Sequence, residues 1–351
     1  MTRHRSAANS SGKEGMATYR AIHVAPDGSL QPTRRELAGP PAGHVRINVE
    51  ACGICHSDAA SVHPHPATEA GVVPGHETVG RIDAIGDGVT GWSVGDRVGV
   101  GYLGGHCGVC EQCRRGNFTA CTDQPVTGAT TDGGYAEYLY ARQSGLVAIP
   151  APLSSVAAAP LLCAGFTVCN ALLKAPLKPG GLVAVQGIGG LGHLGLQYAR
   201  KMGANVVAIA RGTAKADLSR HLGAHHYIDA AATDVGAELT KLGGADIILA
   251  TAASGASMTA LIPGLANGGQ LMVLGASREP IQVSPLALIF DGVTVTGSLT
   301  GSSIENEDNL RFAAQQGVAA MIEEVSLDDA PAAYARMMSG AARFRMVLNI
   351  T

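Results

Sequence analysis

The sequence predicts an α/β protein with two domains, a β-rich barrel followed by a doubly wound parallel sheet. Two patterns indicate this fold. Short β-type runs broken by Gly and Pro extend from about residue 19 to 150, and strands alternate with helices from about 165 to 298. The 351 residues are enough for two hydrophobic cores, and a content of 46% hydrophobic and 15% charged residues is typical of a globular protein.

The first segment, residues 1–18, is polar and has no apolar stretch of the kind found in a secretory signal. We interpret it as a disordered extension. Strand-like alternation begins at Tyr19, so translation starts at either Met1 or Met16.

Residues 19–165 form the predicted barrel domain. Apolar and β-branched runs bounded by turn residues predict strands at 19–24, 45–50, 80–85, 95–98 and 134–138. Regularly spaced short strands of this kind favour an antiparallel barrel.

Residues 166–298 form the predicted parallel sheet. Strands are expected at 182–185, 206–210, 226–229, 246–250, 270–274 and 293–296. Leu191, Leu194, Tyr198 and Met202 recur on one helical face, and a second helix is expected at 214–222. The remainder, 299–351, holds a helical run at 306–317 and a strand at 344–350. It is too short for a domain and is expected to pack back on the first one.

Composition excludes several classes of function. A net charge of −3 offers no basic surface for nucleic acid or an anionic membrane. No apolar run approaches the roughly 20 residues of a membrane span. Cysteines kept as metal ligands indicate a reducing compartment, so we expect a cytoplasmic protein.

Four cysteines lie within 17 residues, separated by two, two and seven residues. Two-residue steps let consecutive thiolates face one point, which is the arrangement of a closed structural zinc site. Disulfides or an iron–sulfur cluster are the alternatives. The predicted ligands are Cys107, Cys110, Cys113 and Cys121.

A glycine-rich turn follows the strand that ends at Gln186 and opens the next helix, the context in which G-x-G-x-x-G binds a dinucleotide. Gly187 would make the turn, Gly189 would admit the pyrophosphate, and Gly192 would allow close helix–strand packing. The alternative is a glycine turn without a ligand. The predicted cofactor loop consists of Gly187, Ile188, Gly189, Gly190, Leu191 and Gly192.

The end of the second parallel strand lacks the acidic residue that pairs with a free ribose 2′-hydroxyl. Ala210 leaves room there, and Arg211 offers a guanidinium for a 2′-phosphate. We therefore expect a preference for NADP(H), with NAD(H) possible, although Arg211 as a solvated surface residue is the alternative.

Three further segments contain potential zinc ligands: Cys55, His76 and Cys163. Two thiolates and one imidazole leave a fourth position open, as in a catalytic zinc site. Alone, each residue is weak evidence, since a lone buried cysteine usually acts as a small hydrophobe.

Taken together, these motifs resemble the zinc-containing medium-chain alcohol dehydrogenase family from about residue 19 onward. The Cys-His-Ser-Asp turn, Gly-His-Glu, the four-cysteine lobe, the Asp-Gly-Gly-Tyr-Ala-Glu run at 132–137, Cys-Ala-Gly and the glycine loop occur in the family's order. The resemblance implies a GroES-like catalytic domain and a Rossmann cofactor domain. Ala210 and Arg211 are more similar to the NADP-using, cinnamyl-alcohol-dehydrogenase-like branch.

The resemblance also implies roles for individual residues. The catalytic zinc ligands would be Cys55, His76 and Cys163, with Glu77 near the metal and Asp58 orienting His76. Other implied roles are proton acceptor for Ser57, cofactor phosphate contact for His56, nicotinamide contact for Thr167, and substrate-pocket walls for Ser57, Tyr102 and Leu103. One departure is Ala60, where family members often have a histidine that completes a proton relay. A water, the cofactor ribose, His63 or His65 would replace it, or proton release is slower.

The implied reaction is hydride transfer between NADP(H) and a primary aliphatic or aromatic alcohol or its aldehyde, with two Zn²⁺ per chain. Alternatives are an NAD-linked alcohol or polyol dehydrogenase, a zinc-independent quinone-type reductase, and a non-catalytic nucleotide-binding or zinc-stabilised structural protein. The family's habit implies a homodimer or homotetramer formed through the sheet edge near 293–297.

Overall fold

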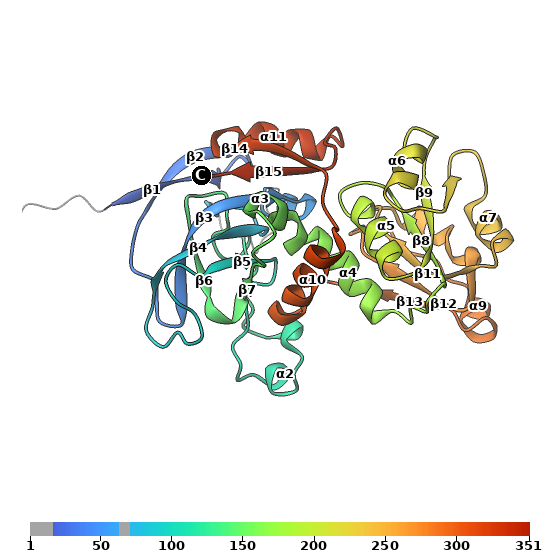
Figure 1. Ribbon diagram of the computed structural model, residues 1–351, viewed down its shortest axis with the longest axis horizontal. Helices are drawn as coiled ribbons and strands as arrows, with labels where there is room; N and C mark the ends of the chain where they lie inside the picture. The colour runs from blue at the N-terminus through green and yellow to red at the C-terminus, as the bar shows by residue number, and fades with distance from the viewer. Residues whose placement is uncertain (1–16, 63–70) are drawn as a thin grey trace, which may run out of the picture.

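The computed structural model describes residues 17–62 and 71–351. Two lobes lie side by side, with helices α4 (Ala164–Lys174) and α10 (Ser303–Gln316) between them (Figure 1). The predicted disordered extension lies almost wholly outside the described residues, except that Thr18 already belongs to the first strand. His63 and His65 also lie outside them.

The first lobe contains a seven-stranded, largely antiparallel sheet with the order β14-β15-β3-β4-β5-β7, in which β6 pairs with β3. A two-stranded antiparallel ribbon, β1 with β2, lies beside it. The strands are β1 (Thr18–Val24), β2 (Leu30–Glu36), β3 (His44–Ile54), β4 (Thr78–Ile85), β5 (Arg97–Val100), β6 (Tyr138–Arg142), β7 (Leu146–Ala148), β14 (Ile322–Ser326) and β15 (Arg345–Asn349).

Short helices join these strands. They are η1 (His56–Asp58), α1 (Ala59–Val62), α2 (Glu111–Arg114), η2 (Phe118–Ala120), η3 (Gln143–Gly145), α3 (Ser155–Ala158), η4 (Ala159–Leu162), η6 (Leu327–Asp329) and α11 (Ala330–Met338). The C-terminal segment returns to this lobe, because β15 pairs with β3 and β14 pairs with β15.

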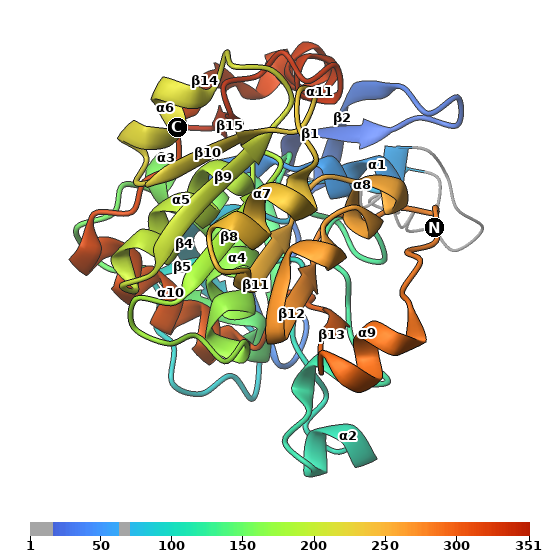
Figure 2. The ribbon, with the colours of Figure 1, turned by 90° about the vertical axis from the view of Figure 1, so that its right-hand side faces the viewer.

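The second lobe is a six-stranded parallel sheet with the order β10-β9-β8-β11-β12-β13 (Figure 2). Its strands are β8 (Leu182–Gln186), β9 (Asn205–Ala210), β10 (His226–Asp229), β11 (Ala245–Ala250), β12 (Leu265–Val273) and β13 (Thr294–Gly297). Its helices are α5 (Gly192–Lys201), α6 (Ala216–His221), α7 (Val235–Lys241), α8 (Gly255–Thr259), η5 (Ile262–Gly264) and α9 (Pro285–Phe290). The predicted α/β fold class is confirmed.

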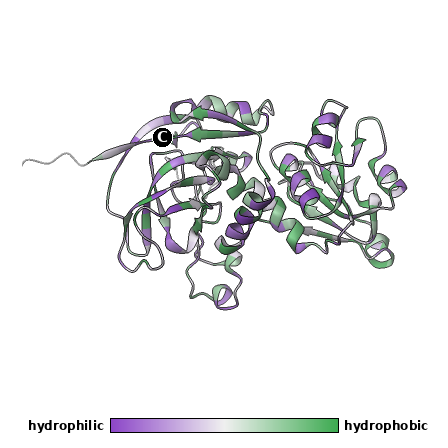
Figure 3. Ribbon diagram, in the orientation of Figure 1, coloured by the Kyte–Doolittle hydropathy of each residue, from purple (hydrophilic) through white to green (hydrophobic). Residues whose placement is uncertain are grey.

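Both faces of this parallel sheet are buried at its central strands β8, β9 and β11, and these strands are nearly continuous apolar runs (Figure 3). Successive side chains of a strand point to opposite faces. Val183 and Val185 accordingly pack in one core with Leu194 of α5, whereas Leu182 and Ala184 pack in another with Leu239 of α7.

Some predicted strand boundaries are wrong. The run 134–138 is a strand only from Tyr138, because the chain before it bends closely over its neighbours: a Cβ on Gly134 would lie 2.0 Å from Thr78 Oγ1. The run 95–98 begins with a turn and enters β5 only at Arg97. The strand expected at 270–274 begins earlier, at Leu265.

Among the described residues, no single helix is long and apolar enough to cross a membrane. One bent pair of helical segments, residues 155–162 followed by α4, has the length and apolar composition of a span, with an angle of 49° between the two segments. All but two residues of α4 are buried within the protein, as expected of a core helix.

Candidate active site and metal centres

The first cluster of metal-ligating side chains lies where the two lobes meet. Cys52 of β3 pairs with Thr78 of β4, so Cys55 just after β3 and His76 just before β4 lie at the same edge of the sheet. Cys163, directly before α4, completes the group. The ligand atoms of Cys55, His76, Glu77 and Cys163 all lie within 4.8 Å of one another.

Asp58 orients the imidazole of His76. Its Oδ1 lies 2.9 Å from Nδ1 of His76, and its Oδ2 accepts hydrogen bonds from the backbone N of Cys55 at 2.9 Å and the Tyr135 hydroxyl at 2.8 Å. Because Nδ1 is the donor in this contact, a neutral ring at this position carries its lone pair on Nε2. Within the described part of the chain, buried Nε2 has no hydrogen-bond partner.

A buried ion pair lies beside this cluster. Arg345 of β15 donates to Glu77 Oε1, and both side chains are almost fully buried. Burial raises the pKa of Glu77 to about 7, against the opposing charge of Arg345. Burial lowers the pKa of Arg345, but the charges of Glu77 and Cys55 outweigh that effect and the net pKa is raised.

The ligand side chains are coupled to one another. The hydrogen bond with Cys163 lowers the pKa of the Cys55 thiol, and the same bond together with burial raises the pKa of Cys163. Burial lowers the pKa of His76, yet the charges of Asp58 and Cys55 raise it overall. The hydrogen-bonded pair of thiols therefore favours one thiolate, on Cys55, and a bound cation would stabilise the second.

The remaining predicted site residues surround the cluster unevenly. Ser57 Oγ lies 3.6 Å from Cys55 Sγ, and both Ser57 and His56 are exposed on η1. Thr167 is buried on α4. The ring of Tyr102 meets that of His76 edge-on, with centroids 5.1 Å apart.

Tyr102 and Leu103 also line a cavity of about 10 Å³ between α4 and α10, room for about one water molecule. Ser57 is not among the residues that line this cavity. Tyr102 and Ser57 therefore both lie beside the cysteine–histidine cluster, but they do not line one common cavity as the predicted substrate pocket requires.

The glycine loop follows β8 as predicted. Gly187 has a φ of +89°, a conformation that side chains other than glycine rarely adopt, and a Cβ on Gly192 would lie 1.9 Å from the Gly187 carbonyl oxygen. A Cβ on Gly189 would meet nothing within 4 Å, so this backbone is open to an approaching group. A Cβ on Gly190 would lie 2.9 Å from Arg345 Nη1, which puts that guanidinium between the loop and the cysteine–histidine cluster.

Ala210 ends β9, half-buried, and Arg211 follows it, exposed. Lys215 lies nearby, with its Nζ donating to the Ile188 carbonyl at 2.6 Å. Burial, Arg343 and Arg211 lower the pKa of Lys215, so several cations gather beside the glycine loop.

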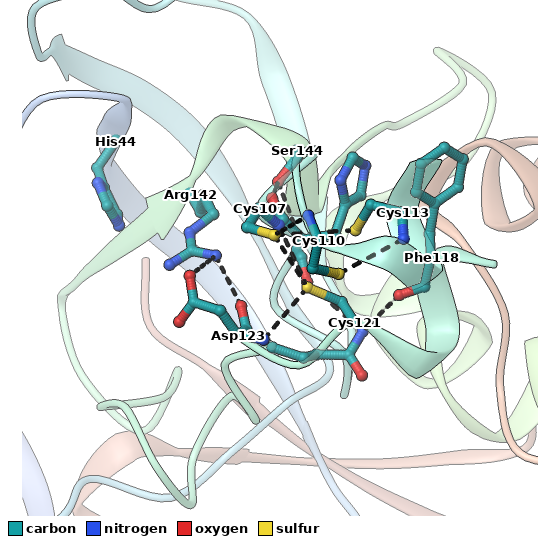
Figure 4. A network of polar contacts seen from close by, with 12 residues as sticks. His44, Cys107, Cys110, Cys113, Phe118, Cys121, Asp123, Arg142 and Ser144 are labelled. Atoms are coloured by element: carbon teal, nitrogen blue, oxygen red, sulfur yellow. Dashed lines mark hydrogen bonds and ion pairs between the residues drawn. The ribbon is translucent and has the colours of Figure 1, made fainter. Parts of the chain in front are cut away.

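The four-cysteine lobe projects from the first domain around α2 (Figures 1 and 2). Its four sulfurs face one another, all within 4.8 Å, and all are free thiols rather than disulfides (Figure 4). Backbone N–H groups of Cys107, Cys110 and Cys113 point at sulfurs at 3.3–3.5 Å. The backbone N–H groups of Cys113 and Thr122 lower the pKa of Cys110 to about 6.

Both clusters have the geometry of zinc sites. Two sulfurs bound at 2.3 Å to one tetrahedral zinc lie about 3.8 Å apart. The Sγ atoms of Cys55 and Cys163 are 3.9 Å apart, and in the lobe Cys107 lies 4.0 Å from Cys113 and 3.6 Å from Cys121. The unpartnered Nε2 of His76 supplies a third ligand at the first site. The residues present therefore fit a closed zinc site in the four-cysteine lobe and a second zinc site of Cys55, His76 and Cys163, beside which Glu77 lies as a further donor.

Comparison with known proteins agrees with this geometry. Residues 41–151 match the alcohol dehydrogenase GroES-like domain, and residues 190–338 match the zinc-binding dehydrogenase domain. An alcohol dehydrogenase, notN, from an Aspergillus species is 42% identical over 315 residues, which are 90% of this chain and 92% of that protein. The chain belongs to the zinc-binding, medium-chain alcohol dehydrogenase family. The resemblance inferred from the sequence is confirmed.

Two solved members of the family have the same fold over nearly the whole chain. A cinnamyl alcohol dehydrogenase from Sorghum bicolor matches with a TM-score of 0.85 and 34% identity, covering 95% of this chain and 98% of that one. A protein named CAD from Helicobacter pylori, solved in complex with NADP(H), matches with a TM-score of 0.81 and 26% identity, covering 95% of this chain and 99% of that one. Within the family, this chain lies in the cinnamyl-alcohol-dehydrogenase-like branch.

Two residues of this site were missed in the sequence. Tyr135 lies in the Asp-Gly-Gly-Tyr-Ala-Glu run at 132–137. An aromatic residue directly after two glycines in that motif could have indicated a role in the site. Nothing in the sequence indicated that Arg345 belongs to the site, since it is separated from Glu77 by 268 residues and lies in an ordinary strand pattern.

Proposed function

We propose that this protein is a zinc-dependent alcohol dehydrogenase and aldehyde reductase that transfers hydride between NADP(H) and primary aliphatic or aromatic alcohols. The observation that carries the proposal is the cluster of Cys55, His76 and Cys163, with a buried, unpartnered Nε2 and the exposed Ser57 hydroxyl beside it. Three ligands and one open side favour catalysis over a structural role.

Cys55, His76 and Cys163 would hold the catalytic zinc, which when bound supplies Lewis acidity toward the alcohol or carbonyl oxygen. Asp58 holds the His76 ring in the ligating tautomer, and Tyr135 and the Cys55 backbone hold Asp58. Cys107, Cys110, Cys113 and Cys121 would hold the second, structural zinc.

Ser57 is the residue we assign to proton transfer. Its hydroxyl lies beside a ligand sulfur and is exposed, so it is placed to accept the proton of an alcohol and pass it to solvent. Ala60 has no group that could extend a relay. We therefore propose that water or the cofactor ribose takes the proton from Ser57.

The cofactor would lie along the glycine loop, with its pyrophosphate at the open backbone of Gly189 and at the start of α5. Arg345 lies between this loop and Glu77, close enough to contribute positive charge to the phosphates. Arg211 and Lys215 support NADP(H), because two cations without an acidic residue at the end of β9 suit a 2′-phosphate better than a ribose diol.

Elemental analysis and initial rates together test the proposal. We expect about two zinc ions per chain in the wild type and aldehyde-dependent oxidation of NADPH. We expect His76→Ala to lose that activity and one zinc. Cys121→Ser should instead lose the zinc of the four-cysteine lobe and keep the zinc held by Cys55, His76 and Cys163. Full activity in His76→Ala, or one zinc per active wild-type chain, would refute the assignment.

A panel of alcohols and aldehydes, each measured with both cofactors, tests the finer substrate and cofactor assignments. A higher kcat/KM with NAD⁺ than with NADP⁺ would contradict the assignment of Arg211 to the 2′-phosphate of NADP(H). Rates confined to polyols would contradict the proposed substrate class.

We also propose a homodimer or homotetramer formed through β13. This strand ends the parallel sheet and, among the described residues, pairs only with β12. Next to it α9 exposes Leu286, Ile289 and Phe290, with exposed fractions of 64%, 69% and 77%. A second copy would cover this edge and its apolar rim. A monomer by light scattering would contradict this proposal.

A further inference from the structure

His193, in the first turn of α5 directly after the glycine loop, is buried with both ring nitrogens engaged. Nδ1 lies 2.9 Å from the Gly189 carbonyl oxygen, and Nε2 lies 3.2 Å from the backbone N of Met321. A carbonyl only accepts and an amide only donates, so the ring is neutral and carries its proton on Nδ1. The ring therefore joins the glycine loop to the segment between α10 and β14.

Gln197, one helical turn later, contacts the same segment. Its Nε2 donates to the Ala319 carbonyl at 2.9 Å, and its Oε1 accepts from the Ala319 N–H at 3.1 Å. Residues 193 and 197 lie on one face of α5. Three hydrogen bonds thus attach the cofactor helix to residues 319–321 of the C-terminal segment.

From Met321 the contacts continue into the active site. Its carbonyl accepts hydrogen bonds at 3.0 Å from the N–H groups of Phe344 and Arg345, at the start of β15. Arg345 then pairs with Glu77, the neighbour of His76. The ring of His193 also packs on that of Phe344, with centroids 4.9 Å apart. An unbroken series of contacts connects Gly189 with the cluster of metal-ligating residues.

We infer that His193 is a positioning residue for hydride transfer, because it fixes the glycine loop relative to the strand that carries Arg345. This inference rests on the proposed function. Hydride transfer requires the cofactor and substrate to meet at contact distance, and a small misplacement of either is costly. The cofactor is held by the parallel-sheet lobe and the substrate by the other lobe, so their separation depends on the contacts between lobes.

Two conservative variants separate the two bonds of His193. In His193→Asn the amide reaches the position of Nδ1, so the contact with Gly189 is kept and that with Met321 is lost. In His193→Gln the longer side chain reaches the position of Nε2, so the contact with Met321 is kept. His225→Ala is the matched control: it deletes a histidine that accepts from the Val206 N–H at 2.8 Å, at the opposite end of the parallel strands.

The measurements are the NADPH dissociation constant by fluorescence, the primary deuterium isotope effect on single-turnover aldehyde reduction, and the thermal midpoint. One net hydrogen bond corresponds to a change of roughly twofold to tenfold. We expect His193→Asn to weaken NADPH binding about threefold to tenfold and to make the isotope effect larger and more temperature-dependent. We expect His193→Gln, which keeps the Met321 contact and the bond from its own backbone N–H to the Gly189 carbonyl at 3.1 Å, to stay within about twofold of the wild type in binding, with an unchanged isotope effect. The same is expected of His225→Ala.

A purely structural role would lower the thermal midpoint of buried His193→Asn and leave its isotope effect unchanged, as in the exposed control His225→Ala, which would overturn the inference. Wild-type binding and isotope effect in His193→Asn would also overturn it. If the wild type itself binds NADPH but transfers no hydride to any aldehyde, the proposed function fails, and this inference fails with it.

Discussion

Replacing Arg345 by methionine removes one partner of a buried ion pair and leaves the Glu77 carboxylate without it. The two side chains are 4% and 0% exposed, so water cannot compensate. Removing one partner from such a pair costs about 3–5 kcal/mol of unfolding free energy, because the buried carboxyl must then stay charged without a partner or bind a proton. For a chain of 351 residues the unfolding entropy is about 0.7 kcal/mol per kelvin, so the thermal midpoint should fall by about 4–7 °C.

The assay is thermal unfolding of the zinc-loaded protein, with metal content measured on the same samples. Arg336→Met is the matched control, since Arg336 pairs with Glu323 at 2.6 Å but is 47% exposed, and such pairs contribute about 0–1 kcal/mol. The double variant with Arg345→Met and Glu77→Gln should be more stable than Arg345→Met alone, because no buried charge remains. Equal losses in Arg345→Met and Arg336→Met, or no recovery in the double variant, would refute the reasoning.

Three further predictions follow from other contacts. Tyr135→Phe removes the hydroxyl that holds Asp58, so catalytic zinc affinity should fall about tenfold in a chelator competition, while the lobe zinc is unaffected; unchanged affinity would contradict the role of Asp58 in orienting His76. Arg211→Ala should reduce kcat/KM with NADPH about tenfold and leave that with NADH nearly unchanged; equal effects on both cofactors would contradict a 2′-phosphate contact. Burial lowers the pKa of His193 to about 4 from an ordinary 6.5, so the unfolded chain binds the proton first as the pH falls. The contribution of His193 to stability should therefore be constant above pH 6.5 and decline by up to about 3 kcal/mol by pH 4, and His193→Gln should lack this part of the slope in urea titrations.

Prediction from the sequence succeeded where the information is local. The four cysteines that cluster in the lobe lie within 17 residues, and the glycine loop lies between one strand and one helix, so spacing alone constrains their geometry. The alternation of apolar strands and amphipathic helices likewise indicated the parallel sheet. Strand ends were predicted less well, as at 134–138, because close packing of glycines against a neighbouring turn decides where pairing begins.

The amino-acid sequence by itself determined the fold class, the cysteine lobe, the glycine loop and the types of residue available as catalytic ligands. Only the tertiary structure decided that Tyr135 holds Asp58, that Arg345 pairs with Glu77, and that His193 joins the glycine loop to the C-terminal segment. The physical reason is that local backbone geometry constrains only residues that are close in the sequence. A turn or helix relates residues a few positions apart, whereas contacts such as Arg345 with Glu77, 268 residues apart, depend on strand register and on how the two lobes pack.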